Sequence, residues 1–196
     1  MSFDCKMHVG KILNMKMYLR RTRTVAIVAL AIFLGSEGRS EDPKTKGSTN
    51  MKITSPAFQE GGEIPAKFSR DGGNRNPALD ISGTPSESKS LVLIVDDPDA
   101  PVGLFTHWLV WNIDPKTTEI AEHSVPNGAV QGTNDFPGAQ YDGPQPPSGT
   151  HRYYFRIFAL DETLSLRAGA KRKELDAAMK GHVIAQSELM GRYTKK

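Results

Sequence analysis

Two apolar runs flank an acidic, proline-containing turn in the middle of the chain. Residues 91–95 and 108–113 are almost entirely apolar and rich in Val, Ile, Leu and Trp, and the stretch between them begins Asp-Asp-Pro-Asp-Ala-Pro. Short runs of this composition are typical of strands that are buried on both faces. The pattern therefore predicts strands at residues 91–97 and 105–113, with carboxylates at the rim of a hydrophobic core.

The other apolar segments are shorter and are separated by turns that contain Gly and Pro. The candidate strands among them are residues 52–58, 64–68, 78–82 and 151–160. Residues 117–123 allow one helical turn at most. Residues 125–141 indicate a loop, because they are rich in Gly, Asn and Asp.

One segment has a clear helical pattern. Residues 171–180 place Leu175 and Met179 four positions apart, and Gly181 follows as a typical helix end. Residues 183–193 fit either a last strand or a second helix. Many short strands with one late helix predict a mainly β protein, an antiparallel β-sandwich of two sheets, Greek-key-like, with a short C-terminal helix.

The net charge of +3 comes from the first fifty residues. These carry nine Lys and Arg against four Asp and Glu, whereas residues 51–196 carry sixteen against eighteen. The remainder of the chain is thus faintly acidic. This balance argues against nucleic acid as a partner, because nucleic-acid binding needs clustered positive charge.

The N-terminal region has the pattern of a secretory signal. Basic residues precede an apolar run of ten at residues 25–34, which is too short to span a bilayer. We predict a signal peptide at residues 1–38, with a mis-assigned start as one reading, a flexible linker at 39–50 and one domain at 51–196. The expected location is periplasmic or secreted, and a retained N-terminal anchor is the alternative.

Several kinds of chemistry have no signal in the predicted domain. The single cysteine, Cys5, lies in the predicted leader, so the domain has no disulfide, no thiol nucleophile and no cysteine-ligated zinc. There is no H-E-x-x-H motif, and Ser148 lies outside a G-x-S-x-G context. We therefore expect no enzyme, with no catalytic residue, no metal and no cofactor.

Four polar side chains stand near the ends of the predicted strands. Asp97 ends one strand, His107 comes early in the next, and His151 and Tyr153 begin a third. Alternation along a strand places His107 on the same face as Leu109. If the three strands are neighbours, the four polar side chains meet at one end of a sheet.

Each of these residues has an ordinary role when taken alone. Asp97 and Asp99 fit a strand end and a turn, His107 fits a core histidine, and His151 fits a surface residue. Taken together, beside the proline-rich segment at 143–149, they favour a site. Imidazole and phenol groups can donate to an oxyanion, and a carboxylate stabilises an imidazolium. A zwitterionic phosphate-bearing ligand would satisfy both signs of charge.

Two sequence elements together resemble the phosphatidylethanolamine-binding protein family. They are Asp97-Pro98-Asp99-Ala100-Pro101, followed by His107, and Gly143-Pro144 with Gly149-Thr150-His151-Arg152-Tyr153. Over residues 51–193 the chain is similar to the bacterial Raf kinase inhibitor-like branch of that family. The segment between Pro101 and His107 is shorter than in the eukaryotic branch, so we do not carry kinase binding over to this chain.

The resemblance implies two antiparallel sheets with a small pocket at one end. Such a pocket would bind phosphate-bearing ligands or other small anions, such as phospholipid headgroups, without catalysis. The residues that match the family's pocket and its rim are Asp97, Asp99, His107, His151 and Tyr153, with Pro98, Pro101 and Gly143. Branch members are often dimers, and transient membrane contact is a further expectation. The alternatives are an inhibitor of a protease or signalling enzyme, which would have a protein target, and a metal-dependent phosphoester hydrolase.

Overall fold

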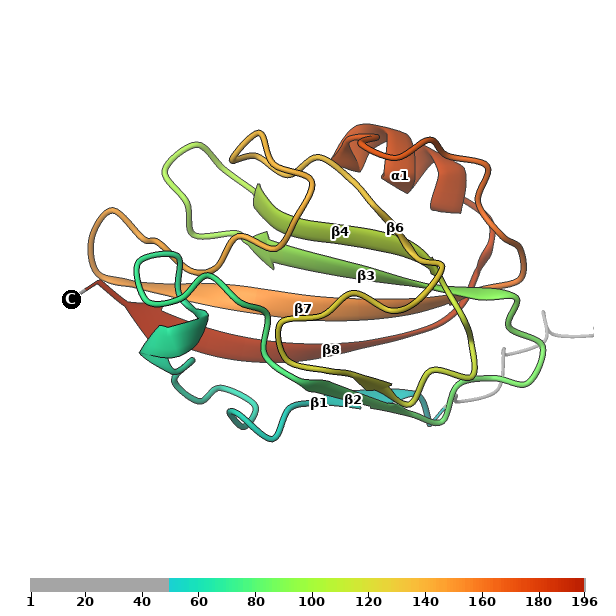
Figure 1. Cartoon of the computed structure of the whole chain (residues 1–196), viewed down its shortest axis with the longest axis horizontal. Coiled ribbons are helices and arrows are strands. Elements are labelled where there is room, and N and C mark those ends of the chain that lie inside the picture. The colour runs from blue at the N-terminus through green and yellow to red at the C-terminus, as the bar shows by residue number, and fades with distance from the viewer. Residues whose placement is uncertain (1–49, 196) are drawn as a thin grey trace, which may run out of the picture. The chain divides into compact units, whose positions relative to one another are not determined.

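The computed structural model describes residues 50–195. The predicted signal peptide at 1–38, and the predicted linker up to residue 49, lie outside the described residues. Within the described part, strands dominate and form two separate antiparallel sheets (Figure 1). The predicted fold class, an antiparallel two-sheet β protein, is confirmed.

The smaller sheet has the strand order β1-β2-β5, and the larger has the order β6-β4-β3-β7-β8. The strands of the smaller sheet are β1 (Lys52–Thr54), β2 (Leu79–Ser82) and β5 (Glu119–Ile120). The strands of the larger sheet are β6 (Val130–Gln131), β4 (Phe105–Ile113), β3 (Ser90–Asp97), β7 (Thr150–Leu160) and β8 (Val183–Thr194). The three longest predicted strands therefore occupy the middle of one sheet as β4, β3 and β7.

The larger sheet is buried on both faces, which explains the continuous apolar runs in its central strands. One face packs against the smaller sheet through a main core whose members from β3 are Leu91, Leu93 and Val95. The other face carries a second core, formed with Val92 and Ile94 and covered by α1 (Arg172–Met179). Figure 1 shows α1 on one side of the larger sheet and β1 and β2 on the other.

The helix α1 confirms the predicted helical segment, with Leu175 and Met179 buried against the sheet. Gly181 follows it with a positive φ of 88°, which suits a helix end. The helix precedes β8, so the chain ends on a strand and not on the helix. Among residues 50–195, no helix is long and apolar enough to cross a membrane.

Some short elements differ from the sequence prediction. Residues 64–68 form no strand, because η1 (Ala66–Phe68), a 3-10 helix, occupies the segment and buries Phe68. Residues 117–123 contain β5 in place of a helical turn, and the predicted loop at 125–141 contains β6. Both strands have two residues, which is too few for a periodic pattern to show in the sequence. Residues 183–193 resolve to a strand, β8.

Candidate functional site

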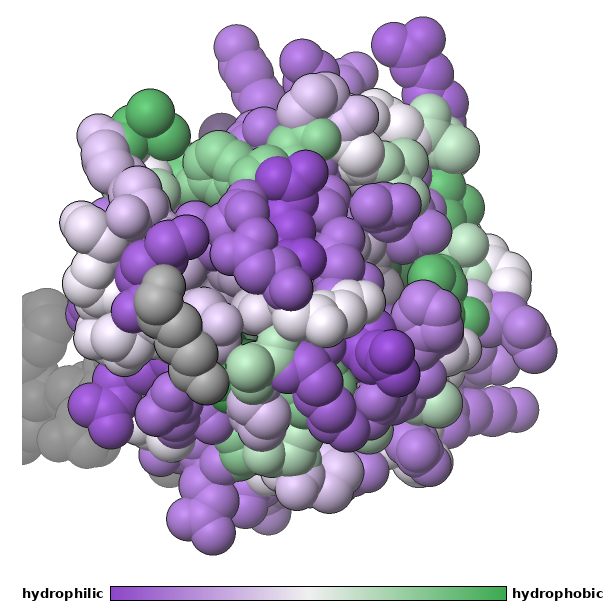
Figure 2. Space-filling model, turned by 60° about the vertical axis from the view of Figure 1, so that its left-hand side comes forward, coloured by the Kyte–Doolittle hydropathy of each residue, from purple (hydrophilic) through white to green (hydrophobic). Residues whose placement is uncertain are grey.

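Three strand ends gather at one edge of the larger sheet. Because β4, β3 and β7 are antiparallel neighbours, the end of β3 lies beside the start of β4 and the start of β7. The connecting loops crowd this end, which is on the left in Figure 1. Figure 2 turns this end toward the viewer and shows a largely hydrophilic surface with isolated hydrophobic patches.

The first pair at this end joins Asp97 of β3 to His151 of β7. The Oδ2 atom of Asp97 lies 2.7 Å from Nδ1 of His151, and both side chains are buried. A carboxylate accepts hydrogen bonds, so Nδ1 carries the proton and Nε2 is left for another partner. The two residues are 54 positions apart in the sequence, and both belong to the four polar side chains expected to meet if the three strands are neighbours.

Asp99 is held away from this pair by Arg152. The Asp99 carboxylate accepts bonds from Nε and Nη2 of Arg152 at 2.9 and 2.6 Å, and from its backbone N–H. Hydrogen bonding to Arg152 lowers the pKa of Asp99 to about 2. The backbone N–H of Asp99 donates to Oδ1 of Asp97, so the turn after β3 fixes the buried carboxylate of Asp97. Asp99 thus supports the turn and does not line the pocket.

His107 reaches the same end through a β-bulge. Val95 pairs with Trp108 and Asp96 pairs with Thr106, so His107 is an extra residue between two paired positions. A bulge re-aims the side chain of the inserted residue. The ring of His107 contacts Tyr153 at a centroid distance of 5.2 Å. The expectation that His107 shares a face with Leu109 was therefore wrong, because Leu109 packs in the second core on the α1 side.

The protonation of His107 follows from its one hydrogen bond. Its Nδ1 lies 2.7 Å from the backbone carbonyl of Asp142, which can only accept, so Nδ1 carries the proton. Burial lowers the pKa of His107, and the ring is neutral near pH 7. Its Nε2 therefore presents a lone pair. Within residues 50–195 neither His107 nor His151 has a hydrogen bond at Nε2.

Asp142 is the central polar residue that sequence reasoning missed. Its buried carboxylate accepts bonds from Asn134 and Asn74, and its Oδ1 lies 3.3 Å from Nε of Arg70. Its backbone carbonyl accepts the bond from Nδ1 of His107. Its backbone N–H donates to the backbone carbonyl of His107. Its position before Gly143 and Pro144 was the only sequence signal. Asp142 therefore fixes the loop that orients one of the two histidines.

Gly143 has a packing role at the edge of the site. A Cβ atom at this position would lie 2.0 Å from the carbonyl oxygen of Phe68, so no larger residue fits. Its N–H donates to Oδ1 of Asn74.

Tyr153 lies below the site, and its buried hydroxyl has no hydrogen-bond partner among residues 50–195. Burial, followed by the charge of Asp97, raises the pKa of Tyr153.

A pocket of ≈ 220 Å³ opens over Asp97, His107 and His151. Its other lining residues are mostly apolar: Ala100, Pro101, Val102, Phe105, Phe136, Gln145 and Pro147. The structure thus brings together four of the predicted site residues, counting Pro101. The other four, Pro98, Asp99, Tyr153 and Gly143, do not line this pocket.

Phe136 and Arg70 complete the mouth of the pocket, and neither was predicted. Phe136 contacts His107 and Phe105 at ring-centroid distances of 5.5 and 4.8 Å. The guanidinium of Arg70 lies 4.1 Å from the Phe136 ring centroid and donates to Oε1 of Gln145. An aromatic residue in a polar loop was the one available sequence signal for Phe136. Arg70 adds a partly exposed positive charge beside two residues of the pocket wall.

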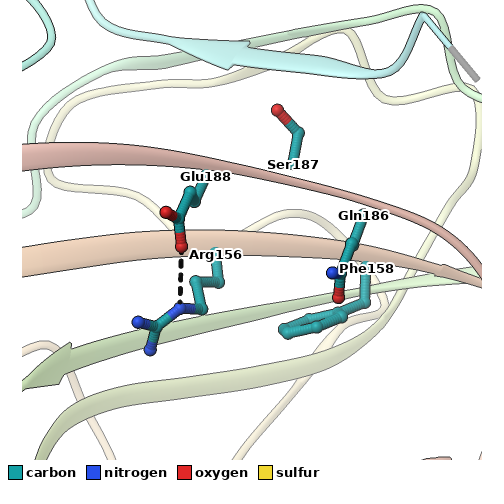
Figure 3. Close-up of a pocket in the computed structure, with 5 residues that line it drawn as sticks. All are labelled: Arg156, Phe158, Gln186, Ser187 and Glu188. Atoms are coloured by element: carbon teal, nitrogen blue, oxygen red, sulfur yellow. Dashed lines mark hydrogen bonds and ion pairs between the residues drawn. The ribbon is translucent and has the colours of Figure 1, made fainter.

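Larger hollows elsewhere in residues 50–195 are lined without any histidine. One of ≈ 360 Å³ lies over β7 and β8, where Arg156 and Glu188 form an ion pair at 3.1 Å (Figure 3). Arg156 also bonds to the fully buried carboxylate of Asp96, so its charge is already compensated. A hollow whose charged groups neutralise one another offers little to an ionic ligand. The smaller pocket at Asp97 is therefore the better candidate site.

No metal position emerges from the described residues. In residues 50–195, no group of three or more His, Cys, Asp and Glu side chains is placed to hold a metal ion. The buried Asp97–His151 pair is a hydrogen-bonded pair of titratable groups facing a pocket. The carboxylate of Asp97 fixes the orientation of the His151 imidazole, which lines the pocket.

Comparison with known proteins gives consistent matches over the described part of the chain. Residues 54–194 match a family model described as phosphatidylethanolamine-binding protein. A UPF0098 protein of Methanothermobacter thermautotrophicus is 45% identical over 150 residues, which is 74% of this chain and 99% of that protein. A UPF0098 protein of Pyrococcus horikoshii is 49% identical over 156 residues, which is 75% of this chain and 78% of that protein.

Solved structures agree with these sequence matches. A phosphatidylethanolamine-binding protein homologue from Chlamydia trachomatis is 45% identical, with a TM-score of 0.73, and the match covers 76% of this chain and 100% of that one. The protein YbcL of E. coli, described as a member of the mammalian PEBP family, is 30% identical with a TM-score of 0.71. That match covers 74% of this chain and 99% of YbcL.

Proposed function

The chain belongs to the phosphatidylethanolamine-binding protein family, and we propose that it binds a small phosphate-bearing ligand of the phospholipid-headgroup type in the pocket of Asp97, His107 and His151. The binding is non-enzymatic. The observation that carries this proposal is the shared anchoring of the two imidazoles. His107 bonds through Nδ1 to the backbone carbonyl of Asp142, and His151 bonds through Nδ1 to the carboxylate of Asp97. In each ring Nε2 therefore remains for a ligand in the shared pocket.

The two histidines offer different partners to a ligand. His151 is oriented by the carboxylate of Asp97 at Nδ1, so its Nε2 faces the pocket and can donate to a phosphate oxygen when it carries a hydrogen. His107 is neutral and accepts at Nε2. A ligand that carries both an anionic oxygen and a hydrogen-bond donor fits this pair. Phosphomonoesters with a P–OH group, and zwitterions with an ammonium group, have both.

The size of the pocket sets a limit on the ligand. A volume of ≈ 220 Å³ lies below the range of roughly 300–1,000 Å³ that is common for drug-sized ligands. The pocket therefore suits a headgroup and excludes the acyl chains of a whole lipid. Arg70, which is paired with Asp142, packs against Phe136 and bonds to Gln145, and so supports two residues of the pocket wall. The predicted signal peptide supports binding in the periplasm or outside the cell.

An NMR titration with O-phosphorylethanolamine tests the proposal. We expect the ring signals of His107 and His151 to shift and saturate, while those of His182, an exposed histidine paired with Asp161, stay in place. In His151→Asn the amide nitrogen takes the position of Nδ1, so the bond to Asp97 is kept while Nε2 is lost. Loss of one charge-assisted hydrogen bond should weaken binding roughly tenfold or more.

The matched control is His182→Asn, which removes the exposed histidine of the Asp161 pair and should leave binding unchanged. Saturable shifts that persist with equal affinity in His151→Asn would place the ligand elsewhere and refute the proposal. An absence of any shift in the wild-type protein, at concentrations that saturate phosphate sites of ordinary affinity, would also refute it.

A further inference from the structure

A second pocket, of ≈ 210 Å³, lies beside the main core and shares no lining residue with the pocket at Asp97. Its floor consists of Trp108 and Tyr141, whose rings meet edge to face at a centroid distance of 5.5 Å. Four side-chain amides line it, and we call it the amide pocket after them: Asn74, Asn76, Gln131 and Gln140.

Two asparagines fix the walls of the amide pocket. Asn76 is buried, accepts a bond from the backbone N–H of Ser124 and donates to the carbonyl of Ala121, each at 3.0 Å, and so holds the turn that these residues form. Asn74 donates to the carboxylate of Asp142 at 2.9 Å on the other side. Because the protein itself occupies these amides, the walls are in place before a ligand arrives, which lowers the cost of binding.

The backbone is strained at two of the lining residues. Among the non-glycine residues of 50–195, a positive φ occurs at Asn74 (48°), Asn112 and His123 (55°), and the first and last of these line the amide pocket. Such conformations cost free energy and gather at ligand sites. The ring of His123 has no hydrogen bond or ring contact within the described part of the chain, so its nitrogens remain for a guest.

The polar groups left free in the amide pocket include several hydrogen-bond donors. The indole N–H of Trp108 can only donate, and it bonds to Oε1 of Gln131 at 2.8 Å. The amino group of Gln131 is therefore turned away from Trp108 and has no partner among residues 50–195. The hydroxyl of Ser124 is also without a partner in this range. These groups favour a ligand that accepts hydrogen bonds.

Arg75 brings a guanidinium to the amide pocket. It lies 3.7 Å from a carboxylate oxygen of Glu122, whose nearer partner is Lys67 at 2.9 Å, so two cations share one anion. Within the described residues, the lining of the pocket contains no Asp or Glu. The balance of these groups is therefore positive, and it suits a guest with a single negative charge better than a phosphate monoester, which carries about −1.5 to −2 at pH 7.

We propose that the amide pocket is a second ligand site, which binds a small organic monocarboxylate. Convergent N–H and O–H donors with one guanidinium match a carboxylate, whose oxygens only accept. The volume of ≈ 210 Å³ lies below the range of roughly 300–1,000 Å³ for drug-sized ligands, so the guest is small. This site does not depend on the proposed function, because the two pockets are lined by different residues.

An NMR titration with propionate tests the proposal, since one tryptophan reports from the pocket and the other from outside it. The indole N–H signal of Trp108 should shift and saturate, while that of Trp111, in the second core on the α1 side, stays in place. Propionamide, which has the same shape without the charge, should cause no saturable shift at the same concentrations. Equal affinity for propionamide, or tighter binding of inorganic phosphate, would overturn the assignment to a carboxylate.

Gln131→Glu places the test at one atom of the lining. It keeps the oxygen that accepts from Trp108 and replaces the amino group with an anionic oxygen, which repels a carboxylate. Propionate affinity should fall about tenfold or more. The matched control is Gln186→Glu, the same substitution at an exposed residue of β8, which should bind propionate like the wild-type protein.

Arg75→Gln is the second variant, at an exposed residue where folding is not at stake. It removes the positive charge, and propionate affinity should again fall about tenfold. His151→Asn, in the other pocket, should leave propionate binding unchanged. The inference is overturned if Trp108 shows no saturable shift in the wild-type protein, if folded Gln131→Glu and Arg75→Gln both keep full affinity, or if His151→Asn abolishes binding.

Discussion

Asp96 and Asp97 are consecutive residues of β3, and their carboxylates lie on opposite faces of the larger sheet in very different surroundings. Asp96 is fully buried on the α1 side and bonds to Arg172 at 2.6 Å and Arg156 at 3.0 Å. Asp97 is buried at the sheet edge and bonds to one imidazole, His151. One carboxylate bonds to two guanidiniums, while the other bonds to an imidazole that lines a pocket.

The difference shows how a buried charge can be assigned a role. Burial raises the pKa of Asp96, and the two guanidiniums that bond to its carboxylate act against this shift. Asp96 does not line the pocket that Asp97 lines. Asp97, in contrast, holds a histidine whose Nε2 has no partner among residues 50–195. The first arrangement attaches α1 to the sheet, and the second orients an imidazole beside a pocket.

The largest expected effect comes from removing the charge of Asp96. Asp96→Asn removes the buried carboxylate that Arg156 and Arg172 share and leaves them only their more exposed partners, Glu188 and Asp176. The loss should cost about 3 kcal/mol of the free energy of unfolding. Urea unfolding measures this loss. Ligand binding at the other face should stay near the wild-type affinity at low temperature, where the variant is folded.

The matched substitution on the other face is His151→Asn, which should affect ligand affinity more than the free energy of unfolding. It keeps the hydrogen bond to Asp97 and should lose less stability than Asp96→Asn, while it loses ligand affinity. A result in which Asp96→Asn abolishes binding in the folded state would contradict the separation of the two faces.

A smaller effect should appear in the pH dependence of stability. Because burial lowers the pKa of His107 below its usual 6.5, the unfolded chain takes up a proton more readily than the folded one. Stability should therefore be complete above pH 6.5 and fall as the pH drops through the lower folded-state pKa. His107→Asn keeps the donor to the Asp142 carbonyl but cannot titrate, so its stability should fall less steeply.

Urea unfolding from about pH 7.5 to about pH 5 measures the two slopes. Parallel curves for the wild-type protein and His107→Asn would mean that His107 does not carry this proton linkage.

The smallest effect concerns the exposed turn. Hydrogen bonding to Arg152 holds the pKa of Asp99 at about 2, and Arg152→Ala should let it rise toward the ordinary 3.8. In the wild-type protein this carboxylate contributes stability that is present above pH 3.8 and lost as the pH falls through about 2. An NMR titration of the Asp99 carboxyl carbon measures the change. An unchanged pKa in the variant would show that another group holds the charge.

The sequence predicts the central strands and one half of the site. The runs in β3, β4 and β7 are long and apolar enough to identify, and simple alternation places Asp97 and His151 on the inner face. The three strands proved to be neighbours in the order β4-β3-β7. Their order is set by pairing between distant segments, which alternation within one strand cannot reveal.

The other half of the site depends on local irregularity. His107 faces the pocket only because a bulge inserts it between two paired residues, and alternation cannot show an inserted residue. Asp142, Phe136 and Arg70 lie in irregular segments, where the position of a side chain follows from tertiary hydrogen bonds such as that from Asn134 to Asp142. Sequence periodicity cannot predict tertiary hydrogen bonds of that kind.

A crystal of the protein soaked with O-phosphorylethanolamine tests the central claim most directly. The account predicts a phosphate group in the pocket within hydrogen-bonding distance of Nε2 of His151, with the bonds from His151 to Asp97 and from His107 to Asp142 retained. Density for the ligand at the hollow beside Arg156, with an empty pocket at Asp97, would contradict the account.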